Sequence, residues 1–456
     1  MTAVSFLEGG LQGGRALPGD DLPWIKARRD AGAERFNALG LPTPKLESWK
    51  YTRLRPLDDT CYTPITDAAD DGAIADLPSI GDVAARIVFV NGKLRTDLSR
   101  FDDLPDGVRF GPLDDVLASD PAWVEAHMGN VAGGAKNGAD SGNDQAMLAL
   151  NDAMMDSGFV LHVAKGVVLS KPLEVVYVGG LTDQAVAYFP RNLIVFEANA
   201  QATLVKHHVG RGVGAYFANA ATEIDLADGA IFKHYKVQAE SIQATHVSSA
   251  HVRIGRDATY ESFQLSIGGL LSRTETMITL AGEGAHCGYH GAYMMRGNEH
   301  CDNTSYIDMA VPHTTCKQVF KGVLDDQARA VFQGKIHVAR DAQKADGRML
   351  NKTLLLSNGA EIDMKPELEI YADDVQCAHG ATSGQLDTTA LFYLRSRGIP
   401  EALARNMLVQ SFLGDALEEI TDETVRAAFL DRVVHWLPAH CYLAGEWKAE
   451  ENRESA

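Results

Sequence analysis

The sequence repeats a turn-like tetrapeptide that ends in alanine: NAQA at 199–202, ADGA at 227–230, GRDA at 255–258 and GEGA at 282–285. The final alanines are 28, 28 and 27 residues apart. A column of mostly large apolar residues stands two positions after these alanines: Leu204, Phe232, Tyr260 and Cys287. A fixed period that carries strands, with small residues at the corners, is typical of a solenoid whose coils cover one another.

The whole region from Gly158 to Ser383 consists of short Val, Ile, Phe and Tyr runs punctuated by Gly, Asn and Asp. Looser echoes of the repeat occur at 326–328 (DQA) and 358–360 (NGA). A β-sandwich shares the short strands and turns, but it would not place an alanine and an apolar residue in register at one interval. We therefore expect a mainly β fold with a right-handed parallel β-helix as its core.

Residues on either side of the repeats have helical patterns. Pro23 and Gly40 are suited to the ends of a helix over 22–38, and Asn91-Gly92 predicts a hairpin. After the repeats, Asp387 can cap a first helix, and apolar residues recur at helical spacing over 400–420 and 421–437. The expected regions are an N-terminal helical and mixed part (1–157), the β-helix (158–385) and a C-terminal helical part (386–456).

The composition excludes several classes of protein. With 45% hydrophobic and 23% charged residues, the 456-residue chain is neither disordered nor a coiled coil. Its net charge of 42 minus 61, or -19, repels the phosphate backbone, so nucleic acid is not an expected partner. There is no basic start followed by an apolar run and no span of about 20 apolar residues. We expect a cytoplasmic protein without a membrane partner.

The cysteines and histidines supply the candidate chemistry. Six cysteines are too few for a disulfide scaffold, and none form a CxxC pair. Cys287 continues the apolar column and is interpreted as a core residue. Cys301 and Cys316 do not fall in an evident column of the repeat. Cys377 and His379 differ from these, because residues two apart on a strand face the same side. They lie at the carboxyl end of the solenoid, where no later coil covers them.

Four segments resemble a known family. They are LEIYADDVQCAHGAT at 368–382, FYLRSRGI at 392–399, ARAVFQG at 328–334 and WKYT at 49–52. Together they are similar to the SufD family, a subunit of the SUF machinery that assembles iron-sulfur clusters. The resemblance implies a β-helix between two helical regions, which agrees with the fold expected from the repeats.

The resemblance also implies partners. Members of this family pair with the paralogue SufB through the carboxyl ends of their β-helices, and they bind the ATPase SufC through their terminal helices. The chain itself has no GxxxxGK[ST] motif, which fits a protein that relies on a separate ATPase. For the isolated chain, without SufB, the alternative expected is a homodimer. The expected ATPase-binding residues are Pro400, Leu403, Met407 and Phe412.

By position, His379 matches the family histidine implicated in cluster assembly, and Cys377 matches the cysteine beside it. His379 is thus the expected metal ligand, at the interface with SufB. The resemblance implies that the cluster is held only transiently there and that the isolated chain keeps no cofactor stably. It also leaves room for a flavin in the complex.

Two departures favour SufD over SufB. SufB-like chains have a cysteine before the Gly-Ala of the penultimate turn, where this chain has Asn358, and an acidic residue where it has Gly380. The expected function is therefore that of a non-catalytic scaffold. The alternatives are a β-helix enzyme and a metal-binding solenoid module. The signal peptide and calcium groove of lyases, and the six-residue rhythm of hexapeptide acyltransferases, are not seen in the sequence.

Overall fold

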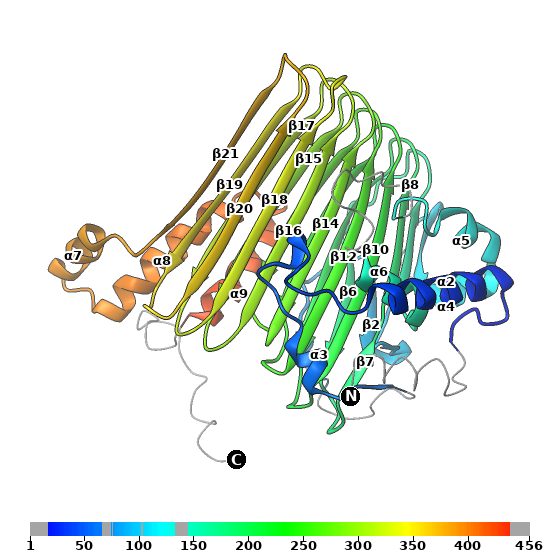
Figure 1. Ribbon diagram of the computed structural model, residues 1–456, viewed down its shortest axis with the longest axis horizontal. Helices are drawn as coiled ribbons and strands as arrows, with labels where there is room; N and C mark the ends of the chain where they lie inside the picture. Colours follow the sequence, from blue (N-terminus) through cyan, green and yellow to red (C-terminus); the bar gives the residue numbers. More distant parts are fainter. Residues whose placement is uncertain (1–16, 66–73, 75, 102–103, 133–144, 438–456) are drawn as a thin grey trace.

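The computed structural model describes residues 17–65, 74, 76–101, 104–132 and 145–437. Two large sheets face each other and form a parallel β-helix (Figure 1). Sheet A has 11 strands and sheet B has 10 among these residues, and from β9 onward successive strands alternate between the two sheets. Each coil thus contributes one strand to each sheet. The mainly β fold expected from the repeats is confirmed.

Both sheets are built from strands of mostly 9–11 residues in the central coils. Sheet A consists of β1 (Thr63–Pro64), β4 (Val108–Pro112), β5 (Phe159–Val163), β7 (Val186–Tyr188), β8 (Arg191–Phe196), β10 (Tyr216–Leu226), β12 (Ala244–Ile254), β14 (Leu271–Leu280), β16 (His300–Met309), β18 (Arg329–Val338) and β20 (Glu361–Ile370). Sheet B consists of β2 (Ala85–Val90), β3 (Lys93–Leu94), β6 (Leu173–Gly179), β9 (Gln201–Gly210), β11 (Ile231–Ala239), β13 (Thr259–Ser266), β15 (His286–Met295), β17 (Thr315–Leu324), β19 (Asp346–Leu355) and β21 (Gln376–Gly384).

A column of buried alanines marks the corner at which each coil enters sheet B. The amide after each alanine donates to the carbonyl of the alanine one coil earlier, as Ile231 does to Ala200. The residue before each alanine has a positive φ, and these residues are of the types that tolerate it: Asn199, Gly229, Asp257 and Gly284. The left-handed residue turns the chain, and the alanine fits the tight corner.

The predicted column needs one correction at its first coil. Phe232 pairs with Ala202, not with Leu204, which pairs with His234 instead. The corner alanine of that coil is Ala200, because the left-handed turn residue is Asn199. The coil is therefore 30 residues long, two more than the sequence spacing suggested. Phe232, Tyr260 and Cys287 do form one column, as expected.

Two further predictions about the repeats were wrong in detail. Cys316 does have a column, because it pairs in register with Cys287 and is likewise buried. The echoes at 326–328 and 358–360 are corners of the other sheet, since they precede β18 and β20 of sheet A. Their looser spacing therefore reflects a second, independent corner of the coil.

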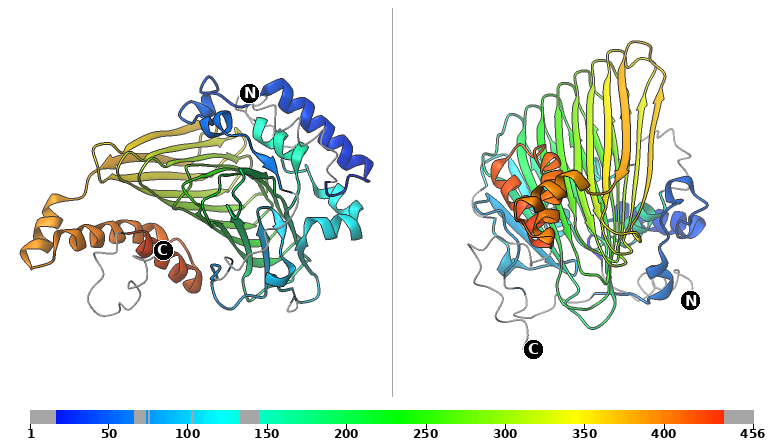
Figure 2. Two further views of the ribbon diagram at one scale, coloured as in Figure 1. Left: turned by 90° about the horizontal axis from the view of Figure 1, so that it is seen from below. Right: turned by 90° about the vertical axis from the view of Figure 1, so that its left-hand side faces the viewer.

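The helices occupy opposite faces of the solenoid (Figure 2). On the N-terminal side, α2 and α6 pack over sheet A, and on the C-terminal side α8 and α9 pack over sheet B. The described helices are α2 (Pro23–Leu39), η1 (Glu47–Trp49), α3 (Arg55–Asp59), η3 (Thr96–Leu98), α4 (Leu113–Ser119), α5 (Pro121–His127), α6 (Ala146–Met154), α7 (Thr388–Ser396), α8 (Glu401–Leu417) and α9 (Glu423–Trp436). The predicted N-terminal helix, the hairpin at Asn91-Gly92 and the Asp387 cap are confirmed.

The WKYT segment fastens the N-terminal region to the outer face of sheet A. Trp49 is fully buried, and the Arg273 guanidinium lies 4.0 Å from the centre of its ring. The Thr52 hydroxyl donates to Asp302, which also pairs with Arg273. A buried aromatic ring and a buried ion pair at one point make this contact specific in position. The role of the WKYT segment is therefore to pack the N-terminal region against sheet A.

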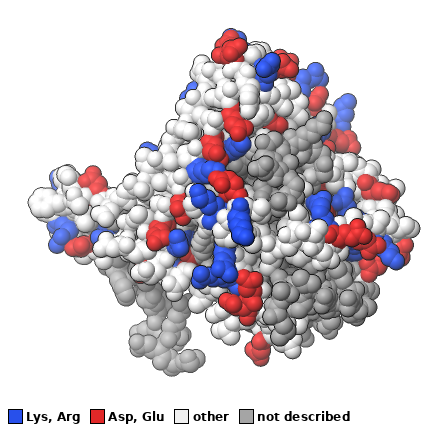
Figure 3. Space-filling view, viewed as in Figure 1, with Lys and Arg blue, Asp and Glu red and all other residues white. Residues whose placement is uncertain are grey.

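The charged surface carries both signs. On the face seen in Figure 3, Lys and Arg side chains lie among Asp and Glu side chains rather than in a basic patch. Within the described residues, the helices are all too short or too polar to cross a bilayer.

Phe232 tests the assignment of the interior column. Its side chain is fully buried and its ring centre lies 4.7 Å from that of Phe196, so Phe232→Ala should reduce the free energy of unfolding by about 3–5 kcal/mol. Cys287→Ala, one sulfur smaller in the same column, should cost much less. Denaturant unfolding of the two variants measures the difference. Equal losses would contradict the column.

Candidate functional site at the open end of the solenoid

Among the described residues, no further coil covers the last one. β20 is the terminal strand of sheet A and β21 that of sheet B (Figures 1 and 2). Side chains that are deeply buried in earlier coils are only half-buried here, as for Met364 and Leu368 of β20. An end of this kind exposes both apolar side chains and free strand edges.

Cys377 and His379 lie on this open end, and their side chains face the lumen. Register shows this directly, because Cys377 pairs with Gly347 and His379 with the buried Met349. Cys377 is half-buried, whereas His379 is exposed. The sequence prediction that the two share one face at the carboxyl end is consistent with this placement. Gly380 and the residues after it continue β21, which runs to Gly384.

Cys377 is the outermost of a row of cysteines. The row runs in register through Cys287, Cys316, Gly347 and Cys377. At Gly347 a Cβ would be in ordinary contact with the Cys377 sulfur, at 3.6 Å, and would come closer, at 3.3 Å, to the sulfur of Met309. Burial raises the pKa of the Cys377 thiol, so the thiol is mainly protonated at neutral pH. It becomes a good metal ligand only when a cation displaces that proton.

The two free edges differ in their capacity to pair. In β21, the amides of Gln376 and of every second residue after it face β19, so those of Cys377, His379 and Ala381 point to the free edge. In β20 the equivalent outward positions include Pro366, which has no N–H to donate. β21 therefore offers an uninterrupted ladder, whereas β20 is interrupted at its centre.

Asn358 stands in the turn before β20, where it is exposed. Its amide is a poor substitute for a thiolate as a ligand for iron. At this end of the solenoid, the cysteine and histidine side chains that face the lumen in the last described coil are therefore Cys377 and His379. Two such ligands do not complete the four-coordinate site that is usual for zinc.

The predicted ATPase-binding residues are spread between surface and core. Pro400 and Met407 are exposed, Leu403 is half-exposed, and Phe412 is partly buried against the chain's own sheet B. Most of the apolar stripe of α8 and α9 is used in the same way, because it packs on sheet B with the side chains Val409, Leu413, Leu417, Ile420, Val425, Phe429 and Val433.

Sequence reasoning did not select two prominent residues of α7. Phe392 is 73% and Tyr393 is 54% exposed, and α7 has no buried residue. The signal was present in the sequence, since a short capped helix with adjacent aromatic residues and no apolar stripe has nothing to pack against. In Figure 1 this helix projects away from the solenoid, close to its open end.

Fold and site define a β-solenoid with one open end that carries Cys377 and His379. Two family models match the chain: "SUF system FeS cluster assembly, SufBD core domain" over residues 180–412 and "SufBD protein N-terminal region" over residues 15–175. The chain belongs to the SufBD family of iron-sulfur cluster assembly proteins.

Relatives with curated names agree with this assignment. The chain is similar to the iron-sulfur cluster assembly protein SufD of Escherichia coli, with 31% identity over 88% of this chain and 90% of that protein. It is 29% identical to a SufBD family protein of Synechocystis, over 86% and 87% of the two chains. SufD of Bacillus subtilis is 26% identical over 88% and 92%. The resemblance noted in the sequence is confirmed over most of the chain.

Proposed function

We propose that this chain is a non-catalytic scaffold that pairs with a SufB subunit through its open end and there contributes to building an iron-sulfur cluster. The observation that carries the proposal is the uncovered last coil. Its lumen-facing apolar side chains and its free edges stabilise the protein only when something covers them. A second solenoid that ends in the same way matches both features at once.

The free edge of β21 sets the geometry of the pairing. A partner strand that adds to this edge receives hydrogen bonds from consecutive outward amides, including that of His379. Pro366 interrupts the equivalent ladder on β20. We therefore place the continuous strand pairing on β21, with apolar packing alone over the centre of β20.

This arrangement puts Cys377 and His379 inside the interface. The imidazole of His379 can bind iron through one nitrogen while the N–H of the other donates a hydrogen bond to an acceptor of the partner, which orients the ring. Cys377 lies two residues away on the same face and is available as a second ligand. The cluster is cargo of the complex, and the other ligands come from SufB. A flavin in the complex remains a prediction from the family resemblance alone.

The ATPase is expected to bind around α7. Since α8 and α9 bury most of their apolar stripe on sheet B, the side chains left for a partner are Phe392, Tyr393 and Met407. Exposed aromatic residues of this kind supply much of the energy at protein interfaces. This refines the expected set, in which Pro400, Leu403 and Met407 stay accessible and Phe412 serves mainly the chain's own packing.

The His379→Ala variant tests the role of the open end. Because the imidazole is exposed and lies on the last strand, its removal should leave folding and association with SufB and SufC nearly unchanged. Cluster content of the complex should fall at least about tenfold if His379 is a ligand. Iron and sulfide analysis of the co-purified complex measures this.

His286→Ala is the matched control, because His286 lies on the outer face of a central coil and is also solvent-accessible. It should retain full cluster content. Loss of the three-protein complex in His379→Ala, or an unchanged cluster content, would each refute the proposed role.

Phe392→Ser combined with Met407→Ser tests the ATPase surface. Both side chains are exposed, so the variant should fold normally but bind SufC at least about tenfold more weakly. Val213→Ser removes an apolar side chain that is 85% accessible from the turn between β9 and β10, and this variant should bind normally. Titration calorimetry with purified SufC gives both affinities. Normal binding by the double variant would exclude α7 as the docking site.

A further inference from the structure

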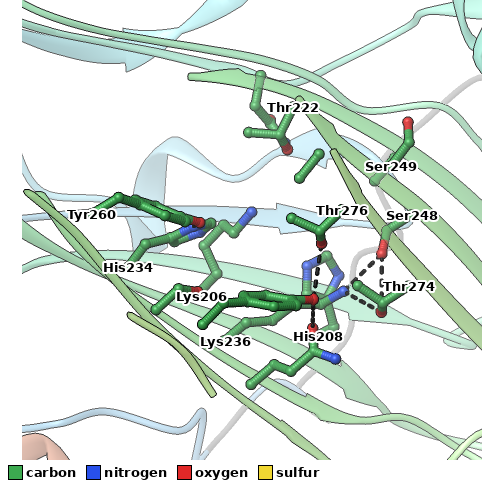
Figure 4. Close-up of a pocket in the computed structure, with 16 residues that line it drawn as sticks. Lys206, His208, Thr222, His234, Lys236, Ser248, Ser249, Tyr260, Thr274 and Thr276 are labelled. Atoms are coloured by element: carbon green, nitrogen blue, oxygen red, sulfur yellow. Dashed lines mark hydrogen bonds between the residues drawn. The ribbon is translucent and has the colours of Figure 1, made fainter. Parts of the chain in front are cut away.

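The lumen of the central coils is polar, unlike the apolar columns on either side of it. Two lysines, Lys206 and Lys236, point into it, and burial lowers their pKa values to about 7 and about 8. Figure 4 shows them around a small cavity of about 30 Å³, with Lys236 hydrogen-bonded to Ser248 and Thr274. His208 and His234 line the same cavity. The proposed function makes no use of these groups.

Three side chains of types that can ligate a metal lie close together at one corner of this lumen. His208 comes from the end of β9, Glu240 from the turn after β11 and His246 from the start of β12. One potential ligand atom from each lies within 4.8 Å of the other two. All three side chains are buried, with exposed fractions of 3%, 6% and 0%. The winding of the coil thus brings together His208 and His246, which are 38 positions apart in sequence.

The ligand atoms are incompletely satisfied by the protein. His246 Nδ1 lies 2.9 Å from Glu240 Oε2. The other carboxylate oxygen, Glu240 Oε1, and the ring nitrogen His208 Nδ1 are buried without a hydrogen-bond partner among the described residues. Burying a charged oxygen and a ring nitrogen in this way is costly, and a bound ion is one of the few ways to offset it.

Neighbouring groups hold these side chains in place. The His208 ring stacks on Tyr177, with ring centres 4.9 Å apart, and meets the His246 ring edge to face. Lys236 Nζ lies 3.1 Å from His246 Nε2, and Gln238 Nε2 donates to Glu240 Oε2 over 3.1 Å. The nitrogen of His246 that faces Glu240 is therefore not the one that Lys236 contacts. The Gln238 contact orients the Glu240 carboxylate in the way that outer partners of metal ligands do. The Lys236 ammonium is a donor and leaves the ring proton of His246 on Nδ1, where a metal would have to replace it.

We propose that His208, Glu240 and His246 form a binding site for a divalent first-row transition metal. Two imidazoles and one carboxylate suit both Fe²⁺ and Zn²⁺, and neither requires a thiolate. Ligand atoms of a tetrahedral site lie roughly 3.3 Å apart, given metal-ligand distances of about 2.0–2.1 Å. The three ligand atoms lie within 4.8 Å of one another, so binding a tetrahedral metal draws them closer together.

The competing occupant is the ammonium group of Lys236. It lies beside His246, and its positive charge opposes a second cation nearby. A purely ionic network would leave the unpaired oxygen of Glu240 and the unpaired nitrogen of His208 unexplained, whereas a metal bound between them engages both. A metal ion has a short path to the site from solvent, because Glu240 begins a surface turn in which Ile242 is 66% exposed.

Metal titration of the full-length chain tests the proposal. After removal of metals by chelator, Zn²⁺ and, under anaerobic conditions, Fe²⁺ are titrated separately, with the rise in unfolding temperature as a second readout. One equivalent of at least one metal should bind and stabilise the chain. His208→Gln and Glu240→Gln should each weaken that binding about ten- to a hundredfold.

His234→Gln is the matched control, since His234 is also a buried lumen histidine but lies outside the trio. It should bind metal normally, as should His379→Ala, which separates this site from the open end. Binding that persists unchanged in the ligand variants, or no binding of either metal, would overturn the proposal.

Co²⁺ absorption of the unaltered chain keeps the test decisive if a ligand variant misfolds. Nitrogen and oxygen ligands give ligand-field bands without a thiolate charge-transfer band. A thiolate band would place the metal at a cysteine and contradict the assignment. Absence of any ligand-field band would do the same.

Discussion

The structure depends on one constraint: each coil must cover the lumen-facing side chains of the coil before it. The corner alanines and their left-handed neighbours keep the strands in register, so that Phe232 lies over Ala202 and Tyr260 over Phe232. Parallel strands cannot satisfy their backbone groups alone, and neither can their apolar faces. Stability therefore accumulates from coil to coil and ends where the coils end.

The open end follows from the same constraint. β20 and β21 are covered on one side only, and the functional candidates Cys377 and His379 occupy lumen positions that would be core in an earlier coil. The position that gives His379 its exposure is thus equivalent to that of the buried Met349 one coil earlier. The proposed function of this end uses surface that folding leaves uncovered.

The sequence predicted the repeat, the flanking helices and the position of Cys377 and His379, because all of these are local patterns. It misplaced Leu204 because the first coil is two residues longer than the sequence spacing suggested. The corner of that coil follows the positive φ of Asn199. It missed the column of Cys316 because residue spacing varies between coils. The exposed aromatic residues of α7 had a local signal, a short capped helix without an apolar stripe, but the grouping of His208, Glu240 and His246 depends on coil geometry and is not visible in a linear pattern.

Hydrogen-deuterium exchange of the amides over 371–385, with and without SufB, tests the central claim most directly. The free chain should exchange rapidly at Cys377, His379 and Ala381, whose amides point to the free edge of β21. Addition of SufB should protect these amides, with less change around Pro366. Protection elsewhere on the chain, with unchanged exchange in β21, would contradict an interface at the open end.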